Sequence, residues 1–141
     1  MNIRSLSEND LIFIAAEKAN FPDGWNYDML LSSFKTGRFN GFIAEDEKTP
    51  IGFITYSVIA PDADIESVYV KKEYRKKGVA SALILAASGD IKRKGCEKIF
   101  LEVRESNLSA INLYVKCGFK KISERKKYYG DETAAVLIKE I

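Results

Sequence analysis

The chain alternates between two hydrophobic periods, and each change of period marks the border of a predicted element. Segments in which every second residue is apolar, with frequent β-branched or aromatic side chains, predict strands. Segments with apolar residues three and four positions apart predict helices, which a following glycine commonly ends. Strands are expected over residues 2–6, 39–45, 51–59, 64–70, 97–103, 119–126 and 134–141. Helices are expected over residues 7–19, 27–34, 79–94 and 107–117.

The order of these elements predicts the fold class. One strand, two helices, three strands, one helix, one strand, one helix and two strands indicate an α/β fold of three layers, with a mixed central β-sheet of about seven strands flanked by about four helices. The polar turn over 46–50 predicts a hairpin. Within the strand over 64–70, Ile65, Ser67 and Tyr69 are expected on one face. Because 141 residues suit one domain and no linker divides them, a single domain over 1–141 is expected.

Composition narrows the class of protein. Since 46% of the residues are apolar and the formal charge is only +2, a folded globular protein is favoured over a disordered chain or a polybasic nucleic-acid binder. The longest apolar run, Ala82–Ala87, is too short to span a membrane, and the charged first ten residues argue against a signal peptide. Cys96 and Cys117 fit a reducing compartment. A cytoplasmic protein without a nucleic-acid or membrane partner is therefore expected.

The absence of histidine restricts the chemistry. Without histidine there is no Ser-His triad, and most zinc sites are excluded as well, so no metal is expected. Proton transfer must then fall to Asp, Glu, Tyr, Lys or water.

A basic turn between the strand over 64–70 and the following helix predicts an anion site. Arg75, Lys76 and Lys77 precede Gly78, where the helix should begin. A helix N-terminus presents unpaired N–H groups and about half a positive charge, so the turn can bind phosphate. A plain solvated basic turn is the alternative.

Two residues are candidates for acid–base chemistry, and each has a structural alternative. Glu102 lies between apolar neighbours on a predicted strand, where burial would raise the pKa of its carboxyl group towards the range of a general base. An ordinary ion pair with Arg104 or a lysine is the other interpretation. Tyr114 either fills the core or directs its hydroxyl group outward from the last helix.

Aromatic residues in two predicted loops are candidates for substrate contacts. Tyr128 and Tyr129 are adjacent, beside a glycine, and two neighbouring loop aromatics are rarely both buried. Trp25 follows the helix-breaking segment 21–24. Simple packing is the alternative for all three.

Several segments together resemble the GCN5-related N-acetyltransferase (GNAT) superfamily. Arg75-x-x-Gly78-x-Ala80 is similar to its acetyl-CoA loop. The segments 101–107, Leu-Glu-Val-Arg-x-Ser-Asn, and 110–119, Ala-x-x-Leu-Tyr-x-x-x-Gly-Phe, follow in the order and spacing of the family. Phe21-Pro22 with Trp25, and Tyr128-Tyr129, more narrowly resemble the bacterial ribosomal-protein-alanine N-acetyltransferases. The resemblance covers nearly the whole chain and implies the three-layer GNAT fold.

The resemblance implies an acetyl-CoA-dependent enzyme that needs no metal and acetylates the N-terminal α-amino group of a protein, with a ribosomal protein that begins with alanine favoured. It implies direct transfer with Glu102 as base and Tyr114 as acid. The implied cofactor-binding residues are Val68, Tyr69, Val70, Arg75, Lys76, Lys77, Gly78, Val79, Ala80, Ser81 and Asn107. The implied acceptor-binding residues are Trp25, Tyr128 and Tyr129. A monomer or weak dimer is expected.

The sequence also leaves alternatives open. Asp64 stands where histone-type relatives carry their catalytic glutamate, so it is the second candidate for the base. Asp23-Gly24, inserted before Trp25, departs from the family pattern in the acceptor loop. Acetylation of a small amine, such as a polyamine or amino acid, is a second possible function, although the aromatic slot is expected to lack the acidic cluster that a polyamine needs. A non-catalytic domain that binds coenzyme A or an anionic polymer is the third.

Overall fold

The computed structural model describes residues 1–17 and 25–141, and its elements follow the predicted order. The strands are β1 (Asn2–Ser5), β2 (Phe39–Asp46), β3 (Thr49–Ile59), β4 (Asp62–Val70), β5 (Lys98–Arg104), β6 (Lys120–Arg125) and β7 (Ala134–Glu140). The described α-helices are α1 (Leu11–Ala16), α2 (Tyr27–Phe34), α3 (Val79–Arg93) and α4 (Leu108–Lys116). The predicted α/β fold with a mixed sheet is confirmed.

The first predicted helix differs from the structure at its start. The 3₁₀ turn Glu8–Asp10 precedes α1, which begins only at Leu11. The Asp10 carboxylate stabilises this turn, because it accepts hydrogen bonds from the Ser7 backbone N–H at 2.8 Å and from the Arg4 guanidinium at 2.7 and 2.8 Å. Such a carboxylate at the end of a turn satisfies N–H groups that the helix leaves unpaired. The predicted break at Phe21-Pro22-Asp23-Gly24, together with Ala19, lies outside the described residues.

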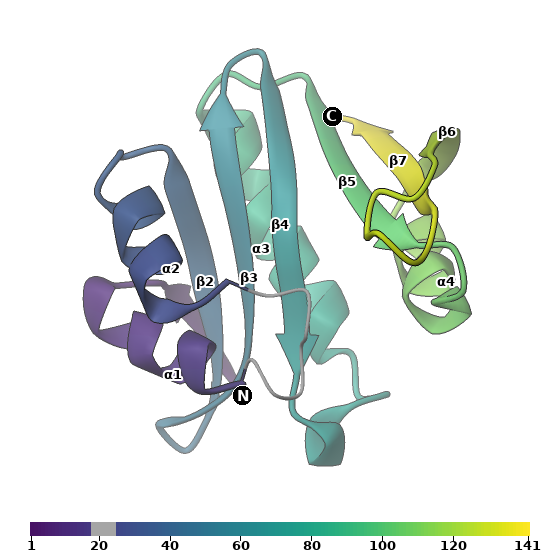
Figure 1. Cartoon of the computed structure of the whole chain (residues 1–141). Helices are drawn as coiled ribbons and strands as arrows, with labels where there is room; N and C mark the ends of the chain where they lie inside the picture. The colour runs from purple at the N-terminus through teal and green to yellow at the C-terminus, as the bar shows by residue number, and fades with distance from the viewer. Residues whose placement is uncertain (18–24) are drawn as a thin grey trace.

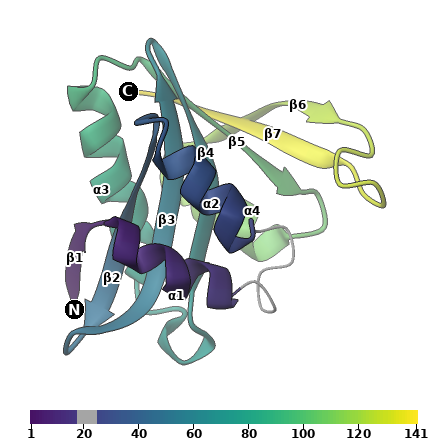
Figure 2. The ribbon, with the colours of Figure 1, turned by 60° about the vertical axis from the view of Figure 1, so that its left-hand side comes forward.

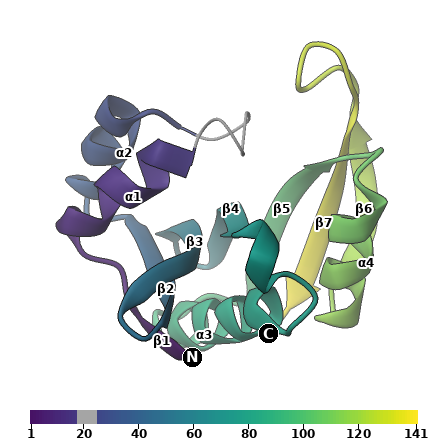
Figure 3. The ribbon, with the colours of Figure 1, turned by 90° about the horizontal axis from the view of Figure 1, so that it is seen from below.

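One seven-stranded sheet separates the helices into two layers. Its strand order is β1-β2-β3-β4-β5-β7-β6, and only the β4–β5 pair is parallel. Helices α1 and α2 lie on one face, over β2 to β4, while α3 and α4 lie on the other (Figures 1, 2 and 3). No helix in the described ranges is long and apolar enough to cross a membrane.

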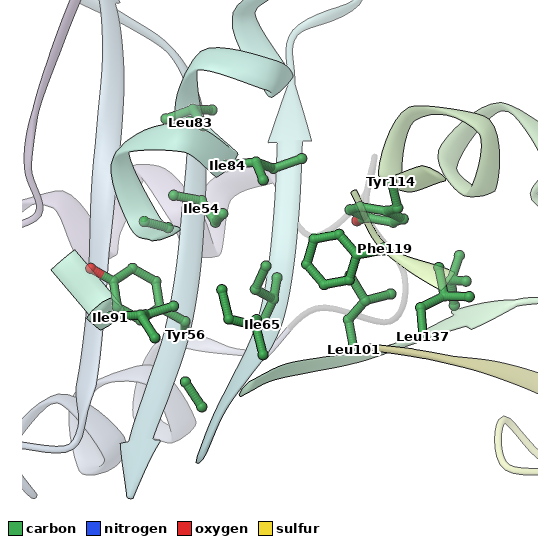
Figure 4. Packing of buried hydrophobic residues seen from close by; sticks show 14 of the residues in the cluster. Ile54, Tyr56, Ile65, Leu83, Ile84, Ile91, Leu101, Tyr114, Phe119 and Leu137 are labelled. Atoms are coloured by element: carbon green, nitrogen blue, oxygen red, sulfur yellow. The ribbon is translucent and has the colours of Figure 1, made fainter. Parts of the chain in front are cut away.

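Two groups of buried side chains hold the layers together. The larger group lies between the sheet and helices α3 and α4; Ile54 and Leu83 represent its α3 side, and Leu101 and Phe119 its α4 side (Figure 4). The smaller group joins α1 and α2 to the opposite face, where Leu11 packs with Phe53 and Tyr69. Burial of these apolar surfaces is the main favourable contribution to folding.

A bulge in β4 changes which residues share a face. Thr55 pairs with Ser67, whereas the next residue, Tyr56, pairs with Ile65, so Glu66 is the extra residue. Ile65 therefore joins the core beneath α3, while Tyr69 packs under α1 and α2. The prediction that Ile65, Ser67 and Tyr69 share one face is wrong, because the extra residue reverses the alternation within the strand.

The sheet is split in its middle. Strands β4 and β5 pair only from Asp62↔Lys98 to Ile65↔Leu101, after which they diverge (Figures 1 and 3). Beyond Ile65, β4 keeps its antiparallel partner β3 on one side, and no described strand pairs with it on the other. An open strand edge of this kind presents backbone N–H and C=O groups to whatever occupies the gap.

Candidate active site

A cleft of about 460 Å³ opens where β4 and β5 diverge. It brings together Glu102 from β5, Tyr114 from α4 and Tyr128 from the β6–β7 loop, residues far apart in the sequence. The predicted residues that line it are Trp25, Val68, Glu102, Asn107, Tyr114, Tyr128 and Tyr129, and Asp64 lines it as well. The predicted loop residues Arg75 to Ser81 do not line this cleft.

Glu102 is held by two partners at the wall of the cleft. Its carboxylate accepts a hydrogen bond from the Arg125 guanidinium at 2.6 Å, within an ion pair that crosses β7. The side chain of Glu102 is 26% exposed, so the carboxylate remains accessible from the cleft. A hydrogen bond with the same carboxylate, aided by burial, raises the pKa of the Tyr128 hydroxyl group. The ion-pair interpretation of Glu102 thus has a partner, although it is Arg125 rather than Arg104 or a lysine.

Tyr114 is both a core residue and a residue of the cleft. Its ring packs edge-on against Phe119, with 5.8 Å between centroids, and only 9% of the residue is exposed. Burial, followed by the nearby Tyr129, raises the pKa of its phenol, so the neutral O–H form is strongly favoured. A neutral phenol at a cleft wall can donate a proton or a hydrogen bond.

Asn107 lies at the start of the helix that carries Tyr114. Its side-chain oxygen accepts a hydrogen bond from the Ala110 N–H at 3.2 Å and so caps α4. This capping role fixes the residue at the cleft rim through ordinary helix chemistry.

The β6–β7 loop with its two tyrosines is fastened to β5. The Arg104 guanidinium bonds to Asp131 at 3.0 Å and Glu132 at 3.3 Å, and it lies 4.5 Å from the ring centroid of Tyr129. Glu132 also accepts a hydrogen bond from the Ser106 N–H at 2.7 Å, next to the cap of α4. These contacts place the tyrosine loop beside the helix that carries Tyr114.

Trp25 closes another side of the cleft. Its ring stacks on Phe39 at 6.0 Å between centroids, with 24° between the planes, and it is partly buried. The sequence left open whether Trp25 packs against the protein or contacts a substrate. Its position is compatible with both, because the ring packs on β2 and also lines the cleft.

Carboxylates line the cleft more densely than predicted. Asp64 and Glu66, from either side of Ile65 in β4, face the same space as Glu102. The pKa of each of these two β4 carboxyl groups is raised, first by burial and then by neighbouring acids that include Glu102. The expectation that the slot lacks an acidic cluster is wrong. Glu66 was not predicted as a site residue. Its spacing of two residues from Asp64 on a predicted strand could have indicated that both side chains lie on one face.

The basic turn and the start of α3 lie after the end of β4 and outside this cleft. Lys76 and Gly78 both have positive φ, +62° and +82°, and α3 begins at Val79. The first N–H groups of a helix have no partner within the helix, so a helix start of this kind can bind an anion. A 3₁₀ turn, Lys72–Tyr74, separates the basic turn from the end of β4.

Two of the predicted cofactor-binding residues, Arg75 and Tyr69, make contacts within the protein. Arg75 donates a hydrogen bond from Nε to the Val70 carbonyl at 2.8 Å, and its guanidinium lies 5.6 Å from the centroid of the Tyr69 ring. Tyr69 points to the face opposite α3, where its hydroxyl group donates to Glu17 at 3.0 Å. The Arg75 side chain and the Tyr69 ring are therefore engaged in contacts within the protein.

The described residues contain no group of three or more histidine, cysteine, aspartate or glutamate side chains arranged to hold a metal ion. The side chains that line the cleft offer carboxylates, phenols and guanidinium groups. Such a site can accept a proton from a nucleophile and return one to a leaving group.

Comparison with known proteins identifies the class. The profile described as "Acetyltransferase (GNAT) family" matches residues 9–119, and this chain belongs to that family of N-acetyltransferases. It is similar to an N-alpha-acetyltransferase of Saccharolobus solfataricus, with 30% identity over 89% of this chain and 83% of the relative. It is also similar to the [ribosomal protein bS18]-alanine N-acetyltransferase of Escherichia coli, with 30% identity over 96% of this chain and 94% of the relative.

Solved structures agree with the sequence comparison. The crystal structure of the Escherichia coli ribosomal-protein-alanine N-acetyltransferase superposes with a TM-score of 0.89 at 26% identity, covering 99% of this chain and 93% of that one. A Bacillus anthracis protein described as a streptothricin acetyltransferase was solved with acetyl coenzyme A, and it matches with a TM-score of 0.69 at 30% identity over 74% and 63% of the two chains. The resemblance inferred from the motifs is confirmed, and the interpretation as a non-catalytic domain is set aside.

Proposed function

We propose that this enzyme acetylates the N-terminal α-amino group of a protein, with a ribosomal protein that begins with alanine as the favoured acceptor. The observation that carries the proposal is the meeting of Glu102, Tyr114 and the aromatic walls at the split between β4 and β5. The similar proteins named for N-alpha and ribosomal-protein-alanine acetylation support the same acceptor class.

The residues of the cleft suit transfer to an α-amino group. Such an amine has a pKa near 8, so a modest base suffices to expose its lone pair at neutral pH. Glu102, directly or through a water molecule, takes the proton from the attacking amine. Tyr114, buried and neutral, returns a proton to the departing thiolate. Holding both reactants in one cleft supplies a further several kcal/mol of rate acceleration.

The residues around the cleft also fit acetyl-CoA, the acetyl donor of the family. The open edge of β4 from Val68 to Val70, where the Val70 carbonyl already accepts from Arg75, offers its remaining backbone groups for the pantetheine amides. The start of α3 after Gly78 offers N–H groups for the pyrophosphate. Lys76 and Lys77 supply positive charge beside that start. A backbone N–H of the β4 edge can also stabilise the oxyanion that develops during transfer.

The walls of the cleft suit an extended peptide with a small first residue. Trp25, Tyr128 and Tyr129 line it with flat, partly polar surfaces, and the tyrosine hydroxyl groups can bond to a peptide backbone. Lysine side chains are expected to react poorly, because a pKa near 10.4 leaves much less neutral amine at pH 7 than an α-amino group has.

Turnover of acetyl-CoA on matched peptides tests this proposal. One peptide has a free N-terminal alanine, the second the same sequence with a blocked N-terminus, and the third a blocked N-terminus with an internal lysine. We expect turnover on the first peptide alone, and a Tyr128→Ala variant that raises the KM for this peptide without weakening acetyl-CoA binding. Absence of turnover on any free peptide N-terminus would contradict the proposal.

A second function is favoured by one observation, the three carboxylates Asp64, Glu66 and Glu102 at the cleft. Three acids facing one space can bind a polyamine, which carries several positive charges. Spermidine turnover separates the two functions. If spermidine is a far better substrate than every peptide, and Glu66→Gln raises the KM for spermidine steeply at low salt, the enzyme acetylates small amines.

A further inference from the structure

Arg125, which the sequence did not mark, contacts two groups of the proposed site. Its guanidinium bonds to the Glu102 carboxylate at 2.6 Å and lies 4.3 Å from the ring centroid of Tyr128. It comes from the last residue of β6, at the sheet edge, and reaches past β7 to β5. Neither contact belongs to the hydrophobic core, since Arg125 itself is largely exposed.

The charges around Glu102 show why this contact matters. From β4, Asp64 and Glu66 line the same cleft with charge of the same sign as Glu102, so the carboxylates repel one another. The tyrosine loop adds the Tyr128 hydroxyl group, which is neutral at pH 7. On β5 itself, the Arg104 guanidinium is bonded to Asp131 and Glu132. Arg125 is in direct contact with Glu102 and supplies a positive charge that offsets this repulsion.

The guanidinium group has a shape that suits both contacts. It is planar, so its edge can donate to a carboxylate while its face stacks on an aromatic ring. Lysine would keep the positive charge but lose the planar stacking surface. The same group can thus hold the Glu102 carboxylate in place while the Tyr128 ring packs against its face.

We propose that Arg125 is a positioning residue that fixes the Glu102 carboxylate in the cleft and orients Tyr128 as a wall for the acceptor. This inference rests on the proposed roles of Glu102 and Tyr128, and it adds a residue that positions both side chains. It predicts two separable effects of removing Arg125: one on kcat, which acts through Glu102, and one on acceptor binding, which acts through Tyr128.

The first effect is measured as kcat on the best acceptor found in the turnover assay. We expect Arg125→Gln to lower kcat several-fold, because Glu102 then loses the contact that fixes its carboxylate and a misplaced catalytic group is costly. Arg125→Lys should restore most of kcat. Lys126→Gln, which removes the same charge from the next residue, should leave kcat unchanged.

The second effect is measured by kinetics on the best acceptor found in the turnover assay. We expect Arg125→Gln to raise the acceptor KM as well as to lower kcat, because Tyr128 loses the guanidinium face on which its ring packs. In a Glu102→Gln background the kcat effect should vanish while the KM effect remains, because the first acts through Glu102 and the second through Tyr128. Arg125→Lys should recover kcat but not KM.

The outcomes distinguish this inference from the proposed function. An unchanged kcat in Arg125→Gln, or equal kcat losses with and without Glu102, would overturn the role of Arg125. Failure to acetylate any peptide would overturn the proposed acceptor, yet the same comparison with spermidine as acceptor would still decide whether Arg125 acts through Glu102. Near-identical circular dichroism spectra and Tm values of the variants establish that each has folded.

Discussion

Replacing Gly78 with glutamate tests the proposed phosphate site at the start of α3. Gly78 has a φ of +82°, and an added Cβ would meet nothing within 4 Å, so the fold can accommodate a side chain there. The cost is that of a left-handed backbone for an L-residue, about 1 kcal/mol. For a chain of this length that cost lowers Tm by about 4 °C. The variant should therefore be folded and only slightly less stable.

The effect on acetyl-CoA binding should be far larger than the effect on stability. The new carboxylate would stand beside the N–H groups that begin α3. Two negative charges about 4 Å apart near a protein surface repel by about 4 kcal/mol. That energy corresponds to a loss of affinity of about a thousandfold.

Isothermal titration calorimetry with acetyl-CoA measures this loss, and the same helix supplies a matched control. Gly95 follows the other end of α3, with a φ of +87° and nothing within 4 Å of an added Cβ. Gly95→Glu should lower Tm to a similar extent while leaving the affinity within about twofold of the wild-type value. If a folded Gly78→Glu protein binds acetyl-CoA as the wild type does, or if both variants lose affinity equally, the reasoning is refuted.

Three further predictions follow from individual contacts. Glu102→Gln should lower kcat most at low pH, where the amine is mostly protonated; a pH–rate profile identical to the wild type would promote Asp64 as the base. Tyr114→Phe should lower kcat at least tenfold with unchanged acetyl-CoA affinity by calorimetry, and equal activity would remove Tyr114 as the acid. Asp10→Asn should cost about 2 kcal/mol of unfolding free energy at pH 7 in urea denaturation. Burial raises the pKa of Asp10, but the Arg4 and Ser7 hydrogen bonds outweigh it and lower that pKa, so this stabilisation is present above pH 4 and is lost on further acidification.

The order of elements could be predicted because it depends on local patterns. Most of the described strands and helices have a hydrophobic period that their own segment carries, and glycine ends such as Gly95 and Gly118 are local as well. The face assignments within β4 could not be predicted in the same way. The bulge at Glu66 arises from how β4 pairs with β3, and a strand sequence does not reveal its own register.

The candidate site was predictable where family motifs cover it, and unpredictable where it depends on strands that meet only in space. Glu102, Asn107 and Tyr114 were named from motifs, and all three line the cleft. Arg125 reaches Glu102 only because β7 inserts between β5 and β6, which the order of elements along the chain does not reveal. The acidic lining was missed for the related reason that Asp64 and Glu66 come near Glu102 only through the pairing of β4 with β5, at the point where the two strands begin to diverge.

The split between β4 and β5 also bears on the stability of the molecule as a whole. With the two strands paired over only four residue pairs, the edge of β4 lacks the partner that a continuous sheet would provide. On the proposed binding mode, acetyl-CoA supplies those hydrogen bonds, so binding and folding are linked. At a hundredfold excess over Kd the ligand adds about 2.7 kcal/mol to the free energy of unfolding. Acetyl-CoA binding should then slow amide hydrogen exchange more in β4 and at the start of α3 than in the outer strands. Protein from which the ligand has been removed during purification should have a measurably lower free energy of unfolding.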